Sequence, residues 1–139
     1  MKIEFYEFGG VDERLLKYAV IVASYRGKWI FVRHGERNTW EIPGGRREPD
    51  ENITDTASRE LREETGALKF QIKSVCVYSV EKDGCKSYGG LFYAQVEGLG
   101  KLPDMEIAEI RLSDTLPEKL TYPLIQPYLF AKAIGLESK

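Results

Sequence analysis

The residues best suited to chemistry are three glutamates, Glu60, Glu63 and Glu64, in the stretch 53–65. This stretch is predicted to be helical, and a spacing of three and four residues places the three carboxylates on one helix face. Like charges at this spacing repel, and enclosing them would cost far more free energy. A hard divalent cation, which takes carboxylate and phosphate oxygens, would offset both costs. By itself the pattern also fits a solvated acidic face relieved by Arg59 and Arg62.

The residues before the predicted helix favour the metal-site interpretation. Pro43-Gly44-Gly45 provides a tight backbone without side chains, where a carbonyl oxygen can approach an ion closely. Glu51 follows at the end of the loop. Arg59 is placed to reach back to Glu51 with a bidentate, charge-assisted hydrogen bond, which would lock the loop onto the helix.

A longer pattern runs through the same region. Its fixed positions are Gly45, Glu51, Arg59-Glu60-Leu61, Glu63-Glu64 and Gly66. This segment, 45–67, resembles the signature of the Nudix hydrolases at every fixed position and spacing. Only Ala67 departs from it, because the family usually has a larger aliphatic residue there.

The resemblance implies an α/β fold, a Nudix-type α/β/α sandwich with a mixed β-sheet between helices, formed by one domain over residues 1–139. It also implies an enzyme that hydrolyses a nucleoside diphosphate linked to another group, with Mg²⁺ or Mn²⁺. In the implied site, Glu60, Glu63, Glu64 and the Gly44 carbonyl bind metal, and Glu60 or Glu63 is the general base. Glu51 and Arg59 are implied to be the orienting pair.

A further acidic residue from a later loop often completes such a site. Glu106 is the expected ligand, with Asp104 and Glu109 as alternatives, a choice that rests on position only.

The substrate is expected to be a nucleoside triphosphate, including an oxidised purine triphosphate, because the run from Arg33-His34 to Trp40-Glu41-Ile42-Pro43-Gly44-Gly45 looks like that branch of the family. The alternatives are ADP-ribose, a nucleotide sugar or a dinucleoside polyphosphate. A module that binds nucleotides without hydrolysing them is the alternative of another class, since a fold does not fix a function. The residues expected to bind substrate are Arg33, Trp40 and Gly45.

Several other residues carry weaker signals. His34 is the single histidine, and a lone histidine is more often structural than catalytic. Trp40, Tyr78, Tyr88 and Tyr93 fit core packing at least as well as substrate contact. An asparagine late in the chain reads the purine in some Nudix proteins; this chain has none after Asn52, and Gln126 is the residue that would replace it.

The elements that must position these residues follow from hydrophobic periodicity. Strands are expected at 17–25 and 28–33, in a hairpin at 71–80 and 86–96 around Asp83-Gly84, and at 107–112. Helices are expected at 53–65, between an Asn52 cap and Gly66, and at 122–134, ending at Gly135. The hairpin turn predicts that Cys76 lies opposite Leu91, which argues against a disulfide with Cys85. Strand-rich order with two separated helices favours a mixed sheet with a helix on each face.

Composition narrows the class of protein. The 139 residues carry 20 Lys and Arg against 22 Asp and Glu, a formal net charge of −2. A nucleic-acid polymer is not an expected partner, because a basic excess or stripe is lacking. There is no apolar run long enough to span a membrane and no signal-peptide pattern, so a cytoplasmic monomer or homodimer acting on a small nucleotide is expected.

Overall fold

The computed structural model describes residues 1–102 and 107–137. The elements in chain order are β1 (Lys2–Tyr6), η1 (Glu13–Leu15), β2 (Leu16–Tyr25), β3 (Lys28–His34), β4 (Gly44–Arg46), α1 (Ile53–Thr65), β5 (Ala67–Lys82), β6 (Cys85–Leu99), β7 (Ile107–Ser113) and α2 (Gln126–Glu137). No helix in these ranges is long and apolar enough to cross a bilayer.

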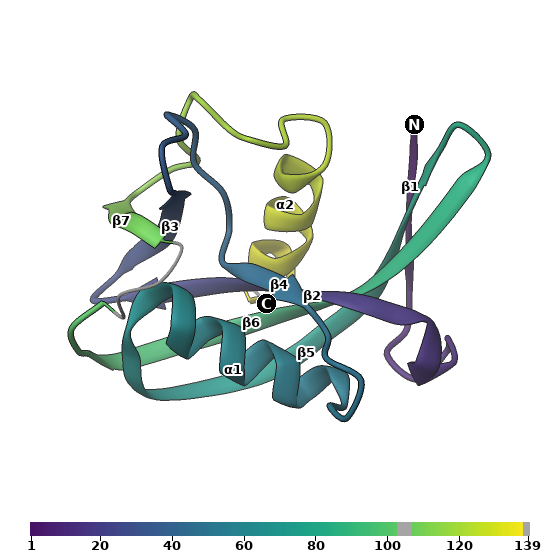
Figure 1. The fold of residues 1–139 in the computed structure, drawn as a ribbon, viewed down its shortest axis with the longest axis horizontal. Helices are drawn as coiled ribbons and strands as arrows, with labels where there is room; N and C mark the ends of the chain where they lie inside the picture. The colour runs from purple at the N-terminus through teal and green to yellow at the C-terminus, as the bar shows by residue number, and fades with distance from the viewer. Residues whose placement is uncertain (103–106, 138–139) are drawn as a thin grey trace.

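The strands form one mixed sheet in the order β1-β5-β6-β2-β3-β7, and β4 pairs with β2 beside this path. β2 and β6 are parallel, and the other pairings are antiparallel. Figure 1 shows α1 and α2 on opposite faces of the sheet. The expected sandwich of a mixed sheet between helices is confirmed.

The central strand β2 serves both faces, because successive side chains of a strand point in opposite directions. Ala19, Ile21 and Ala23 pack in the core cluster that contains Ile53, Ala57 and Leu61 of α1. Val20 and Val22 pack in the second cluster, with Leu129, Phe130 and Ala133 of α2. A nearly continuous apolar run is therefore what a strand covered on both sides requires.

Helix α1 has the predicted bounds, and its caps explain them. The Asn52 side chain accepts a hydrogen bond from the Asp55 N–H at 2.9 Å, which satisfies one of the free amides of the first turn. Gly66 adopts a left-handed φ of 76° at the other end, a conformation that costs a glycine little. These caps fix where the glutamate face starts and stops.

Three differences from the sequence prediction concern the strands and α2. The strands β1, which pairs with β5, and β4, which pairs with β2, were not expected. Helix α2 begins at Gln126, because Pro127 is tolerated in a first turn and residues 122–125 form turns instead. It continues through Gly135.

The hairpin of β5 and β6 follows the predicted register. Cys76 lies opposite Leu91, and Lys82 lies opposite Cys85. Both cysteines are free thiols, as expected. The two strands extend beyond the predicted 71–80 and 86–96, and β1 pairs with the outer part of β5 (Figure 1).

Candidate active site

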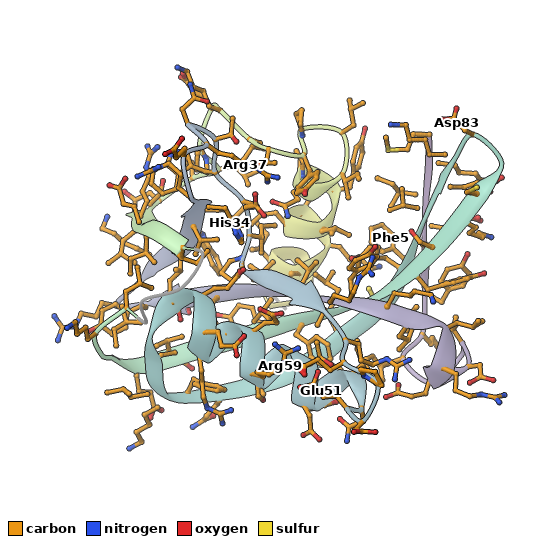
Figure 2. The ribbon with its side chains drawn as sticks, viewed as in Figure 1. Phe5, His34, Arg37, Glu51, Arg59 and Asp83 are labelled. Carbon is orange, nitrogen blue, oxygen red and sulfur yellow. The ribbon has the colours of Figure 1, made fainter. Side chains whose placement is uncertain are left out.

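Arg59 clamps the loop before α1 to the helix. Its Nε and Nη2 donate to the two carboxylate oxygens of Glu51 at 2.5 and 2.9 Å, and Nη2 also donates to the Arg46 carbonyl at 3.0 Å. The bidentate contact expected between Arg59 and Glu51 is therefore present, and Figure 2 labels the two side chains at α1. Hydrogen bonding from Arg59 lowers the pKa of Glu51 to about 2, with help from the Glu48 N–H and the Thr56 hydroxyl.

The three glutamates of α1 form an acidic wall, composed of Glu60, Glu63 and Glu64. The side chains of Glu60 and Glu64 are only 13% and 8% exposed, and that of Glu63 is 36% exposed. Arg59 Nη1 donates to Glu60 at 3.2 Å and to Glu63 at 3.0 Å. The acidic wall is thus largely enclosed, which a simple solvated face would not be.

Enclosure raises the proton affinity of this wall. Burial, followed by repulsion from Glu64, raises the pKa of Glu60 to about 7. Burial also raises the pKa of Glu64, opposed by hydrogen bonds from His34 and the Gly44 N–H. Excess negative charge that cannot reach water is the condition in which a bound cation is most stabilising.

Close backbone approach explains the two glycines before the loop. The Gly44 N–H donates to Glu64 Oε1 at 2.9 Å. A Cβ on Gly45 would lie 2.0 Å from Glu60 Oε2, and one on Gly44 would lie 2.4 Å from the Ala19 carbonyl oxygen. Strand β4 therefore fits between β2 and the acidic wall only because these two positions lack side chains.

A second wall faces the acidic one and comes from distant segments. His34 Nε2 lies 3.1 Å from Glu64 Oε2 and 3.3 Å from Glu41 Oε1, so the ring bridges the two walls. Arg37 Nη1 donates to the other Glu41 oxygen at 3.2 Å. The Ile42 N–H donates to Gln126 Oε1 at 2.8 Å, which fixes the orientation of that buried amide.

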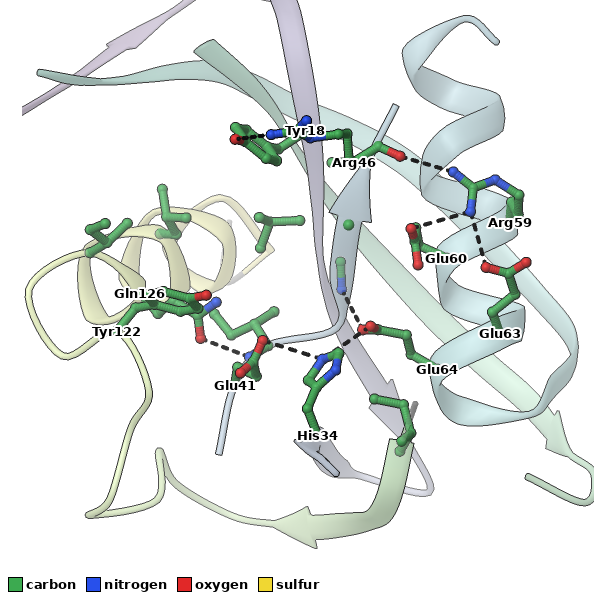
Figure 3. A pocket seen from close by; sticks show the side chains of 18 of the residues that line it. Tyr18, His34, Glu41, Arg46, Arg59, Glu60, Glu63, Glu64, Tyr122 and Gln126 are labelled. Carbon is green, nitrogen blue, oxygen red and sulfur yellow. Dashed lines mark hydrogen bonds and ion pairs between the residues drawn. The ribbon is translucent and has the colours of Figure 1, made fainter. Parts of the chain in front are cut away.

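The two walls line an open cavity of about 1130 Å³ (Figure 3). Its lining includes Gly44, Gly45, Arg59 and the acidic wall on one side, and His34, Glu41 and Gln126 on the other. Tyr18, Arg46, Tyr78 and Tyr122 line it as well. The volume and mixed polar and apolar lining suit a molecule the size of a nucleotide.

Other predicted site residues lie elsewhere. The Arg33 guanidinium binds Glu109 at 3.2 Å and donates to the carbonyls of Gly35 and Arg37, outside the described lining of the cavity.

The Trp40 ring packs against the α2-side cluster, which is the core cluster that contains Leu129 and Phe130, and the Arg111 guanidinium lies 5.6 Å from the ring centre. Glu106 and Asp104 fall outside the described residues. Their roles, and that of Trp40, stay predictions.

Sequence reasoning did not single out Glu41 or Arg46. Glu41 is 9% exposed, a level that an acidic residue seldom reaches without partners. Its place between Trp40 and Ile42, directly before the glycines, was the available signal. Nothing in the local sequence indicated that it would meet His34.

The donor set has the chemistry of a divalent-ion site, but the side chains face other partners. Among the residues that the structure describes, no three or more His, Cys, Asp or Glu side chains converge as a ready metal cage. Glu60 and Glu63 bind Arg59, and Glu64 binds the Gly44 N–H and His34. Hard oxygen donors are nonetheless concentrated on one buried face, as Mg²⁺ or Mn²⁺ binding requires.

Comparison with known proteins establishes the class. The model of the NUDIX domain matches residues 15–125. The chain therefore belongs to the NUDIX family, and its domain is that of a Nudix hydrolase, a class of enzymes that generally use divalent metal ions.

Two relatives are similar to this chain over part of their length. YtkD of Bacillus subtilis, named a putative 8-oxo-dGTP diphosphatase, is 33% identical over 106 residues, or 76% of this chain and 66% of YtkD. NUDT18 of Mus musculus, named an 8-oxo-dGDP phosphatase, is 39% identical over 62 residues, or 45% of this chain and 18% of NUDT18. The chain thus spans just under two thirds of the first and under a fifth of the second.

A solved structure matches almost the whole chain. The Bacillus subtilis pyrophosphohydrolase BsRppH superposes with a TM-score of 0.79 at 26% identity, covering 99% of this chain and 90% of BsRppH.

Proposed function

We propose that the chain hydrolyses a nucleoside triphosphate to the monophosphate and pyrophosphate, with Mg²⁺ or Mn²⁺ as cofactor. The observation that carries this proposal is the enclosed acidic wall beside a nucleotide-sized cavity. Burying Glu60 and Glu64 is unfavourable unless a cation offsets their charge. Arg59 and His34 offset part of that charge; a bound divalent ion would offset the rest, and the diphosphate it carries would lie in the cavity.

The residues proposed to hold the ion are Glu60, Glu63, Glu64, the Gly44 carbonyl and, from the segment not described, Glu106. To do so, Glu60 and Glu63 exchange their contacts with Arg59 for the ion. When bound, the ion neutralises charge on the diphosphate and lowers the pKa of water.

The chain's own residues have separate tasks in this reaction. Glu60 or Glu63 accepts the proton of the attacking water. The water oxygen forms a bond to phosphorus, the P–O bond between the α- and β-phosphates breaks, and pyrophosphate leaves with the electron pair. Arg59 stays protonated, so it holds Glu51 and the Arg46 carbonyl rather than moving a proton.

An oxidised purine triphosphate is the proposed substrate. Two relatives carry names that refer to 8-oxoguanine nucleotides. The Gln126 amide supports a 6-oxopurine, because its oxygen accepts from Ile42 N–H and leaves its NH₂ group as the donor for a ligand in the cavity. Guanine offers an acceptor at O6, whereas adenine offers a donor at the same position.

One panel assay tests the proposed function. Initial rates are measured with Mg²⁺ and with Mn²⁺ on canonical and 8-oxo nucleoside triphosphates, ADP-ribose, a nucleotide sugar and a dinucleoside polyphosphate. We expect the highest kcat/KM on a guanine or 8-oxoguanine triphosphate, with pyrophosphate as product. Faster turnover of ADP-ribose or a nucleotide sugar would contradict the triphosphate proposal. Tight binding without any hydrolysis would instead indicate a nucleotide-binding module.

A further inference from the structure

Arg46 is an exposed arginine on the cavity wall, in contact with Tyr18. It pairs directly with Tyr18 across β4 and β2, its guanidinium lies 5.5 Å from the centre of the Tyr18 ring, and Nη2 donates to the Tyr18 hydroxyl at 3.2 Å. Both residues line the cavity. Stacking and one hydrogen bond occupy one face and one edge of the guanidinium, so several of its five N–H donors stay available to a ligand.

Arg46 differs from the other arginines and the histidine of the cavity in its interaction partners. Arg59 binds Glu51, Arg37 binds Glu41, and His34 lies between Glu41 and Glu64. Within the described ranges 1–102 and 107–137, Arg46 forms no ion pair with a carboxylate; its partner is the neutral Tyr18 hydroxyl. It is therefore a cation whose charge is left for an anionic ligand.

The place of Arg46 defines which part of a ligand it meets. Gly45 faces Glu60, and successive residues of a strand point to opposite sides, so the Arg46 side chain leaves β4 away from the acidic wall. Figure 3 shows it extending toward Tyr18 while its carbonyl turns to Arg59. The cavity thus has the acidic wall on one side of β4 and the Arg46 guanidinium on the other.

We propose that Arg46, steadied by Tyr18, binds a phosphate group of the substrate that the acidic wall does not hold, and so selects nucleotides with three phosphates. This inference rests on the proposed function. A triphosphate carries an additional anionic group next to the diphosphate. A nucleotide sugar has an uncharged sugar in its place, which gives the guanidinium no charge to neutralise.

The test compares Arg46→Gln, Arg46→Lys and Tyr18→Phe with the unchanged chain on a nucleoside triphosphate and on a nucleotide sugar. Arg26→Gln is the matched control, because Arg26 also stacks on a tyrosine, Tyr25, at a turn away from the cavity. We expect Arg46→Gln to raise KM for the triphosphate ten- to hundredfold, the scale of one charge-assisted hydrogen bond, with kcat changed less. The nucleotide-sugar KM changes less than threefold.

The other two variants are expected to raise the KM for the triphosphate by less than Arg46→Gln does. Arg46→Lys restores part of the affinity, because it keeps the charge but loses the planar fork, and Tyr18→Phe raises KM two- to fivefold. Equal losses on both substrates, or an unchanged KM for the triphosphate in Arg46→Gln, would overturn the proposal.

A binding measurement separates this inference from the proposed function. If the unchanged chain hydrolyses no nucleotide, the proposed function fails, and calorimetry with inorganic tripolyphosphate then decides the role of Arg46. At least tenfold weaker binding in Arg46→Gln, but not in Arg26→Gln, supports the anion site. Equal affinity in all three proteins removes it.

Discussion

The two walls of the cavity are built in different ways. The acidic wall and its clamp come from one continuous stretch, in which Gly44 and Glu64 are 20 residues apart. The facing wall joins Ile42 to Gln126 across 84 residues. One wall is a local pattern supported by helix geometry, and the other exists only after the sheet has brought β3, the segment before β4 and α2 together.

The walls also differ in how their charges are balanced. On the facing wall, Glu41 has partners in Arg37 and His34, and Gln126 is satisfied by a backbone amide. Beside the acidic wall, the single cation Arg59 forms ion pairs with four carboxylates, those of Glu48, Glu51, Glu60 and Glu63. We therefore expect mutations of the acidic wall to affect chemistry and those of the facing wall to affect selectivity.

The largest effect is expected from Glu60→Gln, which keeps the shape of the side chain and removes its charge. Activity at saturating Mg²⁺ should fall by roughly 10²–10³-fold, the scale for losing one preorganised charge-stabilising group. Glu64→Gln should show a loss of the same order. Glu97→Gln, on the exposed surface of β6, serves as the control, and a fully active Glu60→Gln protein would refute the assignment of the acidic wall.

Glu60→Gln should also stabilise the metal-free protein at neutral and higher pH. Folding raises the pKa of Glu60 from 4.5 to about 7, so its contribution is most favourable below pH 4.5 and is lost as pH rises through 7. Gln at position 60 removes that loss. Urea unfolding at pH 8 should show a gain on the order of 1–3 kcal/mol over the unchanged chain, and little gain at pH 4. Equal stabilities of Glu60→Gln and the unchanged chain at pH 8 would mean that burial does not destabilise the ionised Glu60 carboxylate.

The next largest effect concerns the clamp. Arg59→Lys keeps the charge but loses the planar fork, and Glu51→Gln weakens the same contact from the other side. Each should lower kcat/KM roughly ten- to a hundredfold, the usual scale for residues that orient metal ligands. The double variant should lose far less than the product, because both changes break one interaction. If the two losses multiply, Arg59 and Glu51 act independently.

Local pattern explains which parts could be predicted from sequence. The bounds of α1, its two caps and the contact between Arg59 and Glu51 depend on residues within 15 positions of one another. The hairpin register that places Cys76 opposite Leu91 depends on one turn. Glycine spacing and helix periodicity are sufficient for such features.

Non-local structure explains what was missed. β4 counts as a strand only because β2 lies beside it, and β1 only because β5 extends far enough to pair with it. The bridge from His34 to Glu41 and Glu64 requires β3 and α1 to meet. The start of α2 at Gln126 depends on how residues 122–125 turn, which proline positions alone do not fix.

A smaller effect, on selectivity, is expected from Gln126→Glu. The new carboxylate still accepts from Ile42 N–H but replaces the NH₂ donor by an acceptor. The ratio of kcat/KM for guanine over adenine triphosphate should fall about tenfold, because an acceptor faces guanine O6 unfavourably and adenine N6 favourably. The ratio is insensitive to a general loss of activity. An unchanged ratio would place the base elsewhere in the cavity.

The smallest effect is expected from Trp40→Phe, which separates core packing from substrate contact at this residue. Trp40 lies next to Glu41 in sequence, but its ring packs with the α2-side cluster and Arg111, outside the described cavity lining. Phenylalanine keeps much of the apolar area and loses some contacts, so stability should fall by about 1–2 kcal/mol. Both kcat and KM should stay within about threefold, since a ring that only supports the sheet contributes equally to free and substrate-bound protein. A KM increase of tenfold or more, with an unchanged free energy of unfolding, would instead establish Trp40 as a substrate-binding residue, as the sequence predicted. It would also extend the facing wall beyond Gln126.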